Sequence, residues 1–150
     1  MSARKEELYR EIIHNTGVEL LPGVAEWLHQ LQAHAIPCAV GSSTHELNIV
    51  TALQMLSLDG TFPVIVSSED VSHGKPDPEV FLLAAERMKM LPESCVVFED
   101  TPVGIEAARA AGMKAVAVTT THPPQALKDA DAIVQRLDEL SIAQLRTWFA

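Results

Sequence analysis

The sequence predicts an α/β protein in which helices cover both faces of a parallel sheet. Short apolar runs alternate along the chain with longer segments whose apolar residues recur every three or four positions. Parallel neighbours need a crossover connection between them, and an intervening helix provides it. With 150 residues, of which 47% are hydrophobic, the chain is long enough for one domain with its own core. These observations indicate a doubly wound fold.

The helices follow from apolar spacing and from residues that favour helix ends. Gly112 is expected to close one helix and Ser141 to cap the last one. In the helix that starts at residue 78, we expect Phe81, Leu82 and Ala85 to face inward. The predicted helices are 2–15, 22–31, 47–56, 78–90, 103–111 and 141–149.

The strands are predicted from the short apolar runs between these helices. Cys38 and Cys95, the only two cysteines, lie in such runs, which predicts buried, reduced thiols and excludes a disulfide framework. The predicted strands are 36–40, 64–66, 95–98, 115–118 and 132–134.

The composition narrows the possible partners. The chain has 20 acidic and 11 basic residues and a net charge of -9, which argues against nucleic acid or an anionic membrane surface as its partner. The N-terminus is charged and helical in pattern, unlike a signal peptide, and no apolar run approaches the roughly 20 residues of a membrane span. We therefore expect a cytoplasmic protein with a small-molecule substrate.

Polar residues gather where the predicted strands end. Ser42, Ser43 and Thr44 follow the first strand, and Glu99, Asp100 and Thr101 follow the third. In α/β folds, ligands bind beyond the carboxyl ends of the strands. Hydroxyl and backbone N–H groups bind phosphate oxygens, and adjacent carboxylates hold Mg²⁺. The loop before residue 78 and the segment after the fourth strand add further candidates, namely Lys75, Thr119, Thr120, Thr121 and His122.

Each of these groups also has a structural explanation when taken alone. Ser42 to Thr44 could form a helix cap, Lys75 could be a solvated surface charge, and Glu99 and Asp100 could be acids at a helix N-terminus. Because all of them occur at the same kind of position, a phosphoryl-transfer site explains the set better than separate structural roles do.

Three segments, GSST, GKPDPEVF and VVFEDTPVGIEAARAAG, occur in this order and together resemble the haloacid dehalogenase (HAD) superfamily. They are most similar to its β-phosphoglucomutase-like phosphatase branch, and LLPGVAEWLHQLQ resembles the point where the helical cap of that branch returns to the core. The resemblance covers residues 20 to about 140. It implies a three-layer αβα HAD-like Rossmannoid core with a parallel sheet over residues 21–150, after a short remnant of the helical cap in residues 1–20.

The resemblance also implies roles for individual residues. Ser42, together with Ser43, would bind the phosphoryl group, and Lys75 would neutralise it, so that Ser42 and Lys75 are the expected catalytic residues. Glu99 and Asp100 would hold a Mg²⁺ cofactor, with Asp100 the expected direct ligand.

One motif of the family is absent. Its nucleophile is the first aspartate of Asp-x-Asp-Gly-Thr, at the end of a central strand, and this chain has no such stretch. The only Asp-x-Asp is Asp129-Ala130-Asp131, which precedes a predicted strand and so belongs at the other edge of the sheet. We therefore expect an N-terminally truncated chain whose central first strand is missing. The flanking strands could pair directly, another chain or fragment could insert a strand, or the chain could be part of a longer gene product, the explanation that we favour.

The resemblance implies a Mg²⁺-dependent phosphatase that acts on a small phosphorylated metabolite through an aspartyl-phosphate in the full-length parent. This chain alone is expected to be inactive. The alternatives are a sugar-phosphate mutase and a non-catalytic module that binds a phosphate ligand or a partner, with self-association or fragment complementation at the missing strand. A receiver domain is disfavoured, because its acidic pair comes first in the sequence and its lysine last, whereas here the order is hydroxyl, lysine, acids. A dinucleotide-binding fold is disfavoured by the lack of Gly-x-Gly-x-x-Gly.

Overall fold

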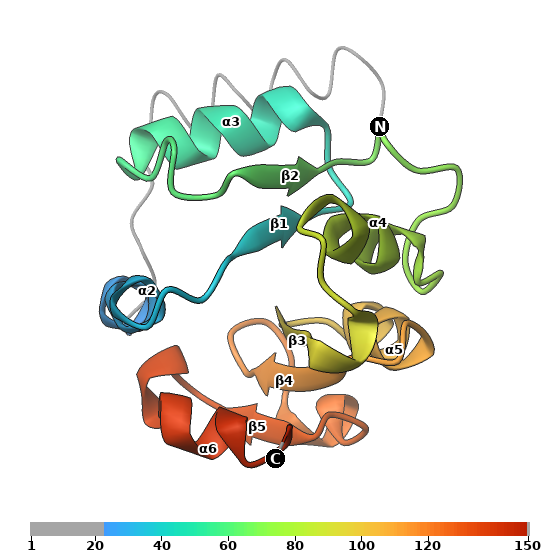
Figure 1. Ribbon diagram of the computed structural model, residues 1–150. Helices are drawn as coiled ribbons and strands as arrows, with labels where there is room; N and C mark the ends of the chain where they lie inside the picture. Colours follow the sequence, from blue (N-terminus) through green and yellow to red (C-terminus); the bar gives the residue numbers. More distant parts are fainter. Residues whose placement is uncertain (1–22, 150) are drawn as a thin grey trace.

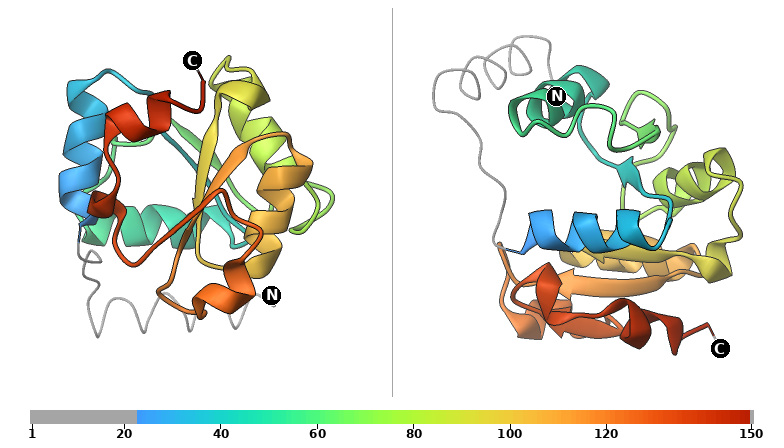
Figure 2. Two further views of the ribbon diagram at one scale, coloured as in Figure 1. Left: turned by 90° about the horizontal axis from the view of Figure 1, so that it is seen from below. Right: turned by 60° about the vertical axis from the view of Figure 1, so that its left-hand side comes forward.

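The computed structural model describes residues 23–149, and these form three layers. The strands lie in the middle, with α4 and α5 on one side and α2 and α6 on the other (Figure 1, Figure 2). The helices are α2 (Val24–Ala33), α3 (Glu46–Met55), α4 (Glu79–Arg87), α5 (Pro102–Ala110) and α6 (Ile142–Arg146), with 3-10 turns η1 (Pro92–Ser94), η2 (Pro124–Leu127) and η3 (Leu137–Glu139). The α/β prediction is confirmed.

All strand pairs in the described residues are parallel, as predicted, but they form two sheets. One sheet pairs β1 (Ala39–Gly41) with β2 (Val64–Val66). The other has the order β3 (Val96–Glu99), β4 (Lys114–Val118), β5 (Ala132–Val134). No ladder joins β1 to β3 within the described part of the chain. Direct pairing of the two strands that carry Ser42 and Glu99 is therefore not the arrangement that this structure adopts.

Within residues 23–149, the core consists of two apolar clusters on opposite faces of the strands. Successive side chains of β3 point to opposite faces of the sheet. Val97 therefore packs in the cluster under α4 and α5, while Val96 and Phe98 pack on the α2 and α6 side. The first cluster includes Val66 of β2 as well as Val97, so α4 and α5 pack across both sheets. On the other face, the rings of Trp27 and Phe98 meet edge to face at 5.7 Å.

Several helix boundaries differ from the predictions. The first described helix begins at Val24, because Gly23 precedes it with a left-handed φ of 89°. The helix predicted for residues 78–90 ends at Arg87, and the last helix ends at Arg146 rather than at residue 149. Ser141 does cap that last helix, since its hydroxyl accepts a hydrogen bond from the Gln144 N–H, as predicted.

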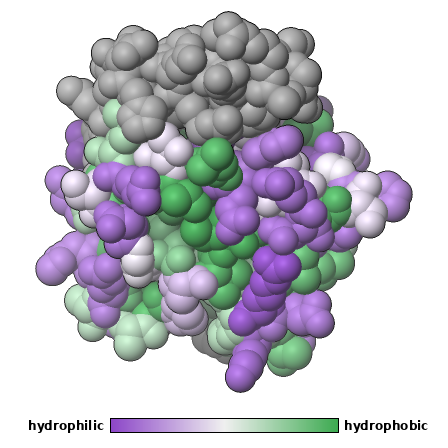
Figure 3. Space-filling view, turned by 90° about the horizontal axis from the view of Figure 1, so that it is seen from above, coloured by the Kyte–Doolittle hydropathy of each residue, from purple (hydrophilic) through white to green (hydrophobic). Residues whose placement is uncertain are grey.

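The inward-facing set predicted for α4 is wrong at one position. Phe81 and Ala85 are buried, but Leu82 is 39% exposed. Leu82 follows Phe81 by one residue, which turns it about 100° around the helix and away from the face that Phe81 and Ala85 share. On the face shown in Figure 3, hydrophobic and hydrophilic residues are interspersed.

The strand boundaries also shift. β1 begins at Ala39 and includes Gly41, so only part of the predicted 36–40 run is a strand. β3 includes Glu99, which makes this acid the last residue of the strand rather than the first residue after it. Gly112 has a φ of 77° and follows the end of α5, which agrees with its predicted helix-closing role.

The prediction of buried cysteines is wrong in degree. Both thiols are free, but Cys38 and Cys95 are only half-buried, and this partial burial raises the pKa of each thiol above its ordinary value. The predicted helix over residues 2–15 and the cap remnant over residues 1–20 lie outside the described residues. In residues 23–149, no helix has the length and apolar character needed to cross a bilayer.

Candidate active site

Lys75 lies between the carboxyl ends of the two sheets. Its Nζ donates a hydrogen bond to Glu99 Oε2 at 2.8 Å and another to the carbonyl oxygen of Gly41 at 3.4 Å. Gly41 ends β1 and Glu99 ends β3. The side chains of Lys75 and Glu99 are each only 10% exposed. Lys75 is therefore not a solvated surface charge, and the structure brings it together with one of the two predicted metal-binding acids.

The loop that carries Lys75 is held by Glu79 of α4. The Glu79 carboxylate accepts hydrogen bonds from the backbone N–H groups of Ser72 and His73, both at 2.9 Å. These two bonds, first that from Ser72 and then that from His73, hold the pKa of Glu79 below its ordinary value. The Phe81 ring, whose centroid lies 4.9 Å from the Lys75 ammonium, adds a cation–π contact. One helix thus positions both the loop and its lysine.

Glu99 is saturated with hydrogen bonds. Its Oε1 accepts from the Asp100 N–H and from the Thr101 hydroxyl, both at 3.1 Å, while Lys75 occupies Oε2. Thr101 is the N-cap of α5 and accepts from the Gly104 N–H at 3.1 Å. The explanation that Glu99 is merely an acid at a helix N-terminus is therefore wrong, since it belongs to the strand and Thr101 caps the helix.

Asp100 lies next to the segment that follows β4. The Thr121 hydroxyl is 2.9 Å from Asp100 Oδ2, and His122 Nδ1 is 3.1 Å from the Asp100 carbonyl oxygen. Thr101, Thr121 and His122 were all expected at this edge from their positions in the sequence, but no role was predicted for them. Their position after a parallel strand was the available signal, because the ends of β3 and β4 lie side by side.

The Ser42 to Thr44 segment forms a turn at the end of β1. The Ser42 N–H continues the pairing with β2 by donating to the Val66 carbonyl at 2.9 Å, and its Oγ accepts from the Thr44 N–H at 3.2 Å. Ser43 is exposed. The N-cap of α3 is His45, so a simple helix cap does not account for this serine pair.

The backbone brings Ser42 to the site, because it directly follows Gly41, whose carbonyl contacts Lys75. No hydrogen bond joins Ser42 or Ser43 to Lys75 within residues 23–149. Lys75 and Glu99 are thus in direct contact, and Asp100 directly follows Glu99 in the sequence. Ser42 and Ser43 follow Gly41, whose carbonyl contacts Lys75, by one and two residues.

The chain matches the model of one protein family over most of its length. The model of the haloacid dehalogenase-like hydrolase family matches residues 1–118. The chain belongs to this family. The described residues contain the segments GSST, GKPDPEVF and VVFEDTPVGIEAARAAG, and the parallel α/β architecture agrees with the resemblance.

Two curated relatives of this HAD-like chain are phosphatases by name. The chain is 40% identical over 146 residues to the chloroplastic 5-amino-6-(5-phospho-D-ribitylamino)uracil phosphatase of Arabidopsis thaliana. This match covers 97% of this chain and 39% of that protein. The chain is 35% identical over 131 residues to the phosphorylated carbohydrates phosphatase of Thermotoga maritima, covering 86% of this chain and 58% of that protein. The chain therefore spans 39% and 58% of the length of these two relatives, which is less than two thirds in each case.

A solved structure gives the same family. The β-phosphoglucomutase of Clostridium difficile superposes with a TM-score of 0.85 at 25% identity, covering 97% of this chain and 63% of that one. The likeness to the β-phosphoglucomutase-like branch is thereby confirmed at the level of sequence relatives and of fold.

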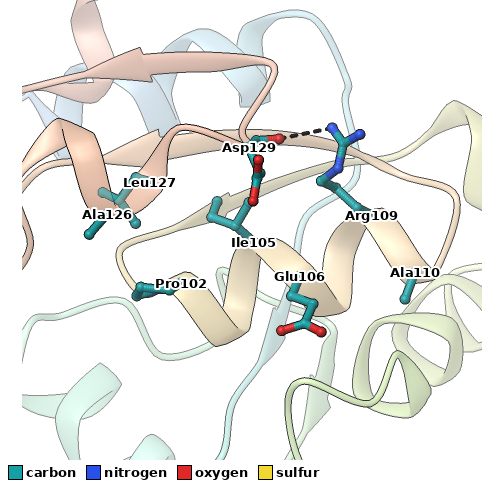
Figure 4. Close-up of a pocket in the computed structure, with 8 residues that line it drawn as sticks. All are labelled: Pro102, Ile105, Glu106, Arg109, Ala110, Ala126, Leu127 and Asp129. Carbon is teal, nitrogen blue, oxygen red and sulfur yellow. Dashed lines mark hydrogen bonds between the residues drawn. The ribbon is translucent and has the colours of Figure 1, made fainter.

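The two acids of the only Asp-x-Asp in this HAD-like chain, Asp129 and Asp131, lie away from the candidate site, as the sequence predicted. Asp131 Oδ2 accepts from the Ala115 N–H at 2.8 Å, near the start of β4 and hence at the amino edge of the sheet. Asp129 borders a depression of about 360 Å³ between α5 and η2, where its carbonyl accepts from Arg109 at 2.8 Å (Figure 4). The residues around this depression include none of the predicted site residues.

Proposed function

We propose that this chain forms the phosphate- and metal-binding core of a phosphatase that acts on a small phosphorylated metabolite. One observation carries the proposal: the Lys75 ammonium is nearly buried at the point where the ends of β1 and β3 converge. A buried cation costs free energy unless it is paired, and Lys75 is held there by Glu99 and by a backbone carbonyl. The names of the two phosphatase relatives support the same reaction class.

Lys75 and the serine turn divide the binding of the phosphoryl group. Lys75 provides a positive charge to the phosphoryl oxygens. The Ser42 Oγ accepts from Thr44, and its own proton has no acceptor among residues 23–149, so that it is available to a phosphate oxygen. Ser43, exposed in the same turn, adds a second hydroxyl and backbone donor.

The acids fit a Mg²⁺ ion with Asp100 as its direct ligand. Both Glu99 oxygens have donors, whereas Asp100 Oδ1 has no partner in the described part of the chain. No group of three or more potential metal ligands lies within residues 23–149. Mg²⁺ suits such a site, because it binds through one or two carboxylates and keeps several waters. When bound, the ion neutralises charge on the phosphoryl oxygens, while Glu99 keeps Lys75 oriented.

In this proposal the nucleophile comes from a segment that these 150 residues do not contain. In the proposed parent protein, the first aspartate of Asp-x-Asp-Gly-Thr attacks phosphorus, and its carboxylate oxygen bonds to phosphorus as the ester P–O bond breaks. The second aspartate of the motif gives its proton to the departing alcohol oxygen, and water then hydrolyses the aspartyl-phosphate to inorganic phosphate and the free aspartate. A strand that carries this motif would lie between β1 and β3, where no ladder is present. In this proposal the strand is supplied by the same gene product or by a separate fragment. The alternative is that two copies of this chain associate at this position.

An activity assay tests this proposal. We expect the purified chain to hydrolyse p-nitrophenyl phosphate very poorly with Mg²⁺ present, and a fragment with the Asp-x-Asp-Gly-Thr strand to restore turnover. Lys75→Met should abolish the restored activity, whereas Lys89→Met, which changes an exposed lysine two residues after the end of α4, should leave it intact. Strong Mg²⁺-dependent turnover by the chain alone would show that the missing motif is not needed, and no turnover with the fragment would contradict the phosphatase assignment.

Two other functions are each favoured by one observation. The fold of the Clostridium difficile β-phosphoglucomutase supports a sugar-phosphate mutase, and conversion of a hexose 1-phosphate by the complemented protein would distinguish it from a phosphatase. The absence of Asp-x-Asp-Gly-Thr supports a non-catalytic module that binds phosphate ligands. Phosphate binding without any restored turnover would favour that module.

A further inference from the structure

Two polar side chains, those of Thr121 and His122, converge on Asp100 from the segment after β4. The Thr121 hydroxyl lies 2.9 Å from Asp100 Oδ2 and 3.1 Å from the Asp100 carbonyl oxygen. His122 Nδ1 lies 3.1 Å from that carbonyl and 2.9 Å from Thr121 Oγ1. Both residues belong to a loop that starts where β4 ends at Val118, beside the end of β3.

Hydrogen-bond chemistry assigns the protons of this cluster. The Asp100 carbonyl and carboxylate oxygens can only accept, so His122 Nδ1 must carry a proton to bond with the carbonyl. The same Nδ1–H also faces a lone pair of the Thr121 oxygen. The single Thr121 proton is then directed to Asp100 Oδ2, at the shorter of its two distances. This assignment fixes one carboxylate oxygen and leaves Oδ1 without a partner in residues 23–149.

We infer that Thr121 is a positioning residue for metal binding: its hydroxyl holds Asp100 Oδ2 so that Oδ1 is presented to a divalent cation. This inference rests on the proposed function, in which Asp100 is the metal ligand. An aspartate has a rotatable side chain, and a charge-assisted hydrogen bond to one oxygen selects the orientation of the other. Removing a hydrogen-bond partner of a metal ligand typically lowers the metal affinity by about 10–100-fold.

Metal affinity, rather than turnover, provides the test. Mn²⁺ serves as a paramagnetic probe for the Mg²⁺ site, because both ions prefer carboxylate and water ligands. Free Mn²⁺ is measured by electron paramagnetic resonance during titration of the full chain and its variants. We expect Thr121→Val to weaken Mn²⁺ binding about 10–100-fold, and Thr121→Ser, which keeps the hydroxyl, to bind as the wild type does. Thr120→Val is the matched control, because Thr120 is an exposed neighbour whose hydroxyl makes none of these contacts.

The possible outcomes separate this inference from the proposed function. If Asp100→Asn weakens Mn²⁺ binding and Thr121→Val does not, the metal site stands and the positioning role of Thr121 is overturned. Equal weakening by Thr120→Val also overturns it, because the loop as a whole would then be responsible. If the wild-type chain binds no Mn²⁺, the proposed metal site fails and this inference fails with it. Thermal unfolding of each variant accompanies the titration, and Thr121→Ala replaces Thr121→Val if the latter does not fold.

Discussion

At the scale of single residues, Glu99 has the most tightly constrained surroundings in the candidate site. Its two oxygens accept three hydrogen bonds, from Lys75, Asp100 and Thr101. Gly104 lies against the same side chain, since a β-carbon added there would overlap the Glu99 Cγ and Cδ atoms. The site therefore depends on a glycine in the first turn of α5 as well as on its charged residues.

We predict that Gly104→Ala destabilises the protein and displaces Glu99 from Lys75. Helix propensity alone would favour alanine by up to about 1 kcal/mol, but forcing a methyl group into a filled space typically costs about 1–3 kcal/mol. Chemical denaturation measures the change in unfolding free energy. Gly74→Ala is the control, because nothing lies within 4 Å of a β-carbon at Gly74. A Gly104→Ala variant more stable than the wild type would contradict the steric argument.

At the scale of elements, the loop that carries Lys75 depends on α4. Glu79 is the first residue of that helix, and its carboxylate ties down the backbone of Ser72 and His73. Asp70, at the other end of the loop, accepts from the Ser67 N–H and hydroxyl and pairs with Arg87 at the end of α4, and its pKa is lowered, mainly by the Ser67 N–H. Both ends of this irregular segment are thus attached by carboxylates.

The lowered pKa of Glu79 predicts a loss of stability in acid. A carboxyl group whose pKa is lower in the folded than in the unfolded state stabilises the fold above its unfolded value, near 4.3, and loses that contribution as the pH falls through the folded value. Glu79→Gln should therefore make the unfolding free energy less sensitive to acid below about pH 4.3. Thermal unfolding across this range measures the effect, with Glu86→Gln, an exposed change on the same helix, as the control. An identical pH dependence in wild type and Glu79→Gln would exclude this role.

At the scale of the whole molecule, the two sheets differ in their support. β4 is paired on both sides, and its central residues Ala115, Val116 and Ala117 are 0% exposed. β1 and β2 form a two-stranded sheet of three-residue strands, which by itself is a marginal unit. The apolar cluster under α4 and α5 joins them to the rest of the core. Stability should therefore be distributed unevenly across the strands.

We predict that backbone amides of β4 exchange with solvent hydrogen most slowly and that those of β1 and β2 exchange faster. Exchange of protected amides reports the free energy of local opening, and a strand with a single ladder opens more readily than one with two. Native-state hydrogen exchange followed by mass spectrometry measures this order. A fragment that pairs with β1 and β3 should slow exchange in both strands. Equal protection of β1 and β4 in the chain alone would contradict the prediction.

The sequence predicted much of the fold because its signals are local. Apolar periodicity located the described helices and strands to within a few residues, and the positions after the strands placed Lys75, Glu99 and Asp100 at one edge. The errors came from local ambiguity. Leu82 fits an apolar helix but faces solvent, and Glu99 could be assigned to the strand or to the turn after it. Roles in binding phosphate or metal stay predictions for Ser42, Ser43, Lys75, Glu99 and Asp100.

The sequence by itself determined which chemical groups the site could contain, because residue types and their order after each strand are written in the chain. Only the tertiary structure decided which of them meet. Lys75 and Glu99 are 24 residues apart, and Thr121 and Asp100 are 21 apart. Such contacts depend on how strands and helices pack, and no local periodicity encodes that packing. Within the described residues, the tertiary structure likewise leaves β1 and β3 unpaired with each other, because strand pairing is a relation between distant segments.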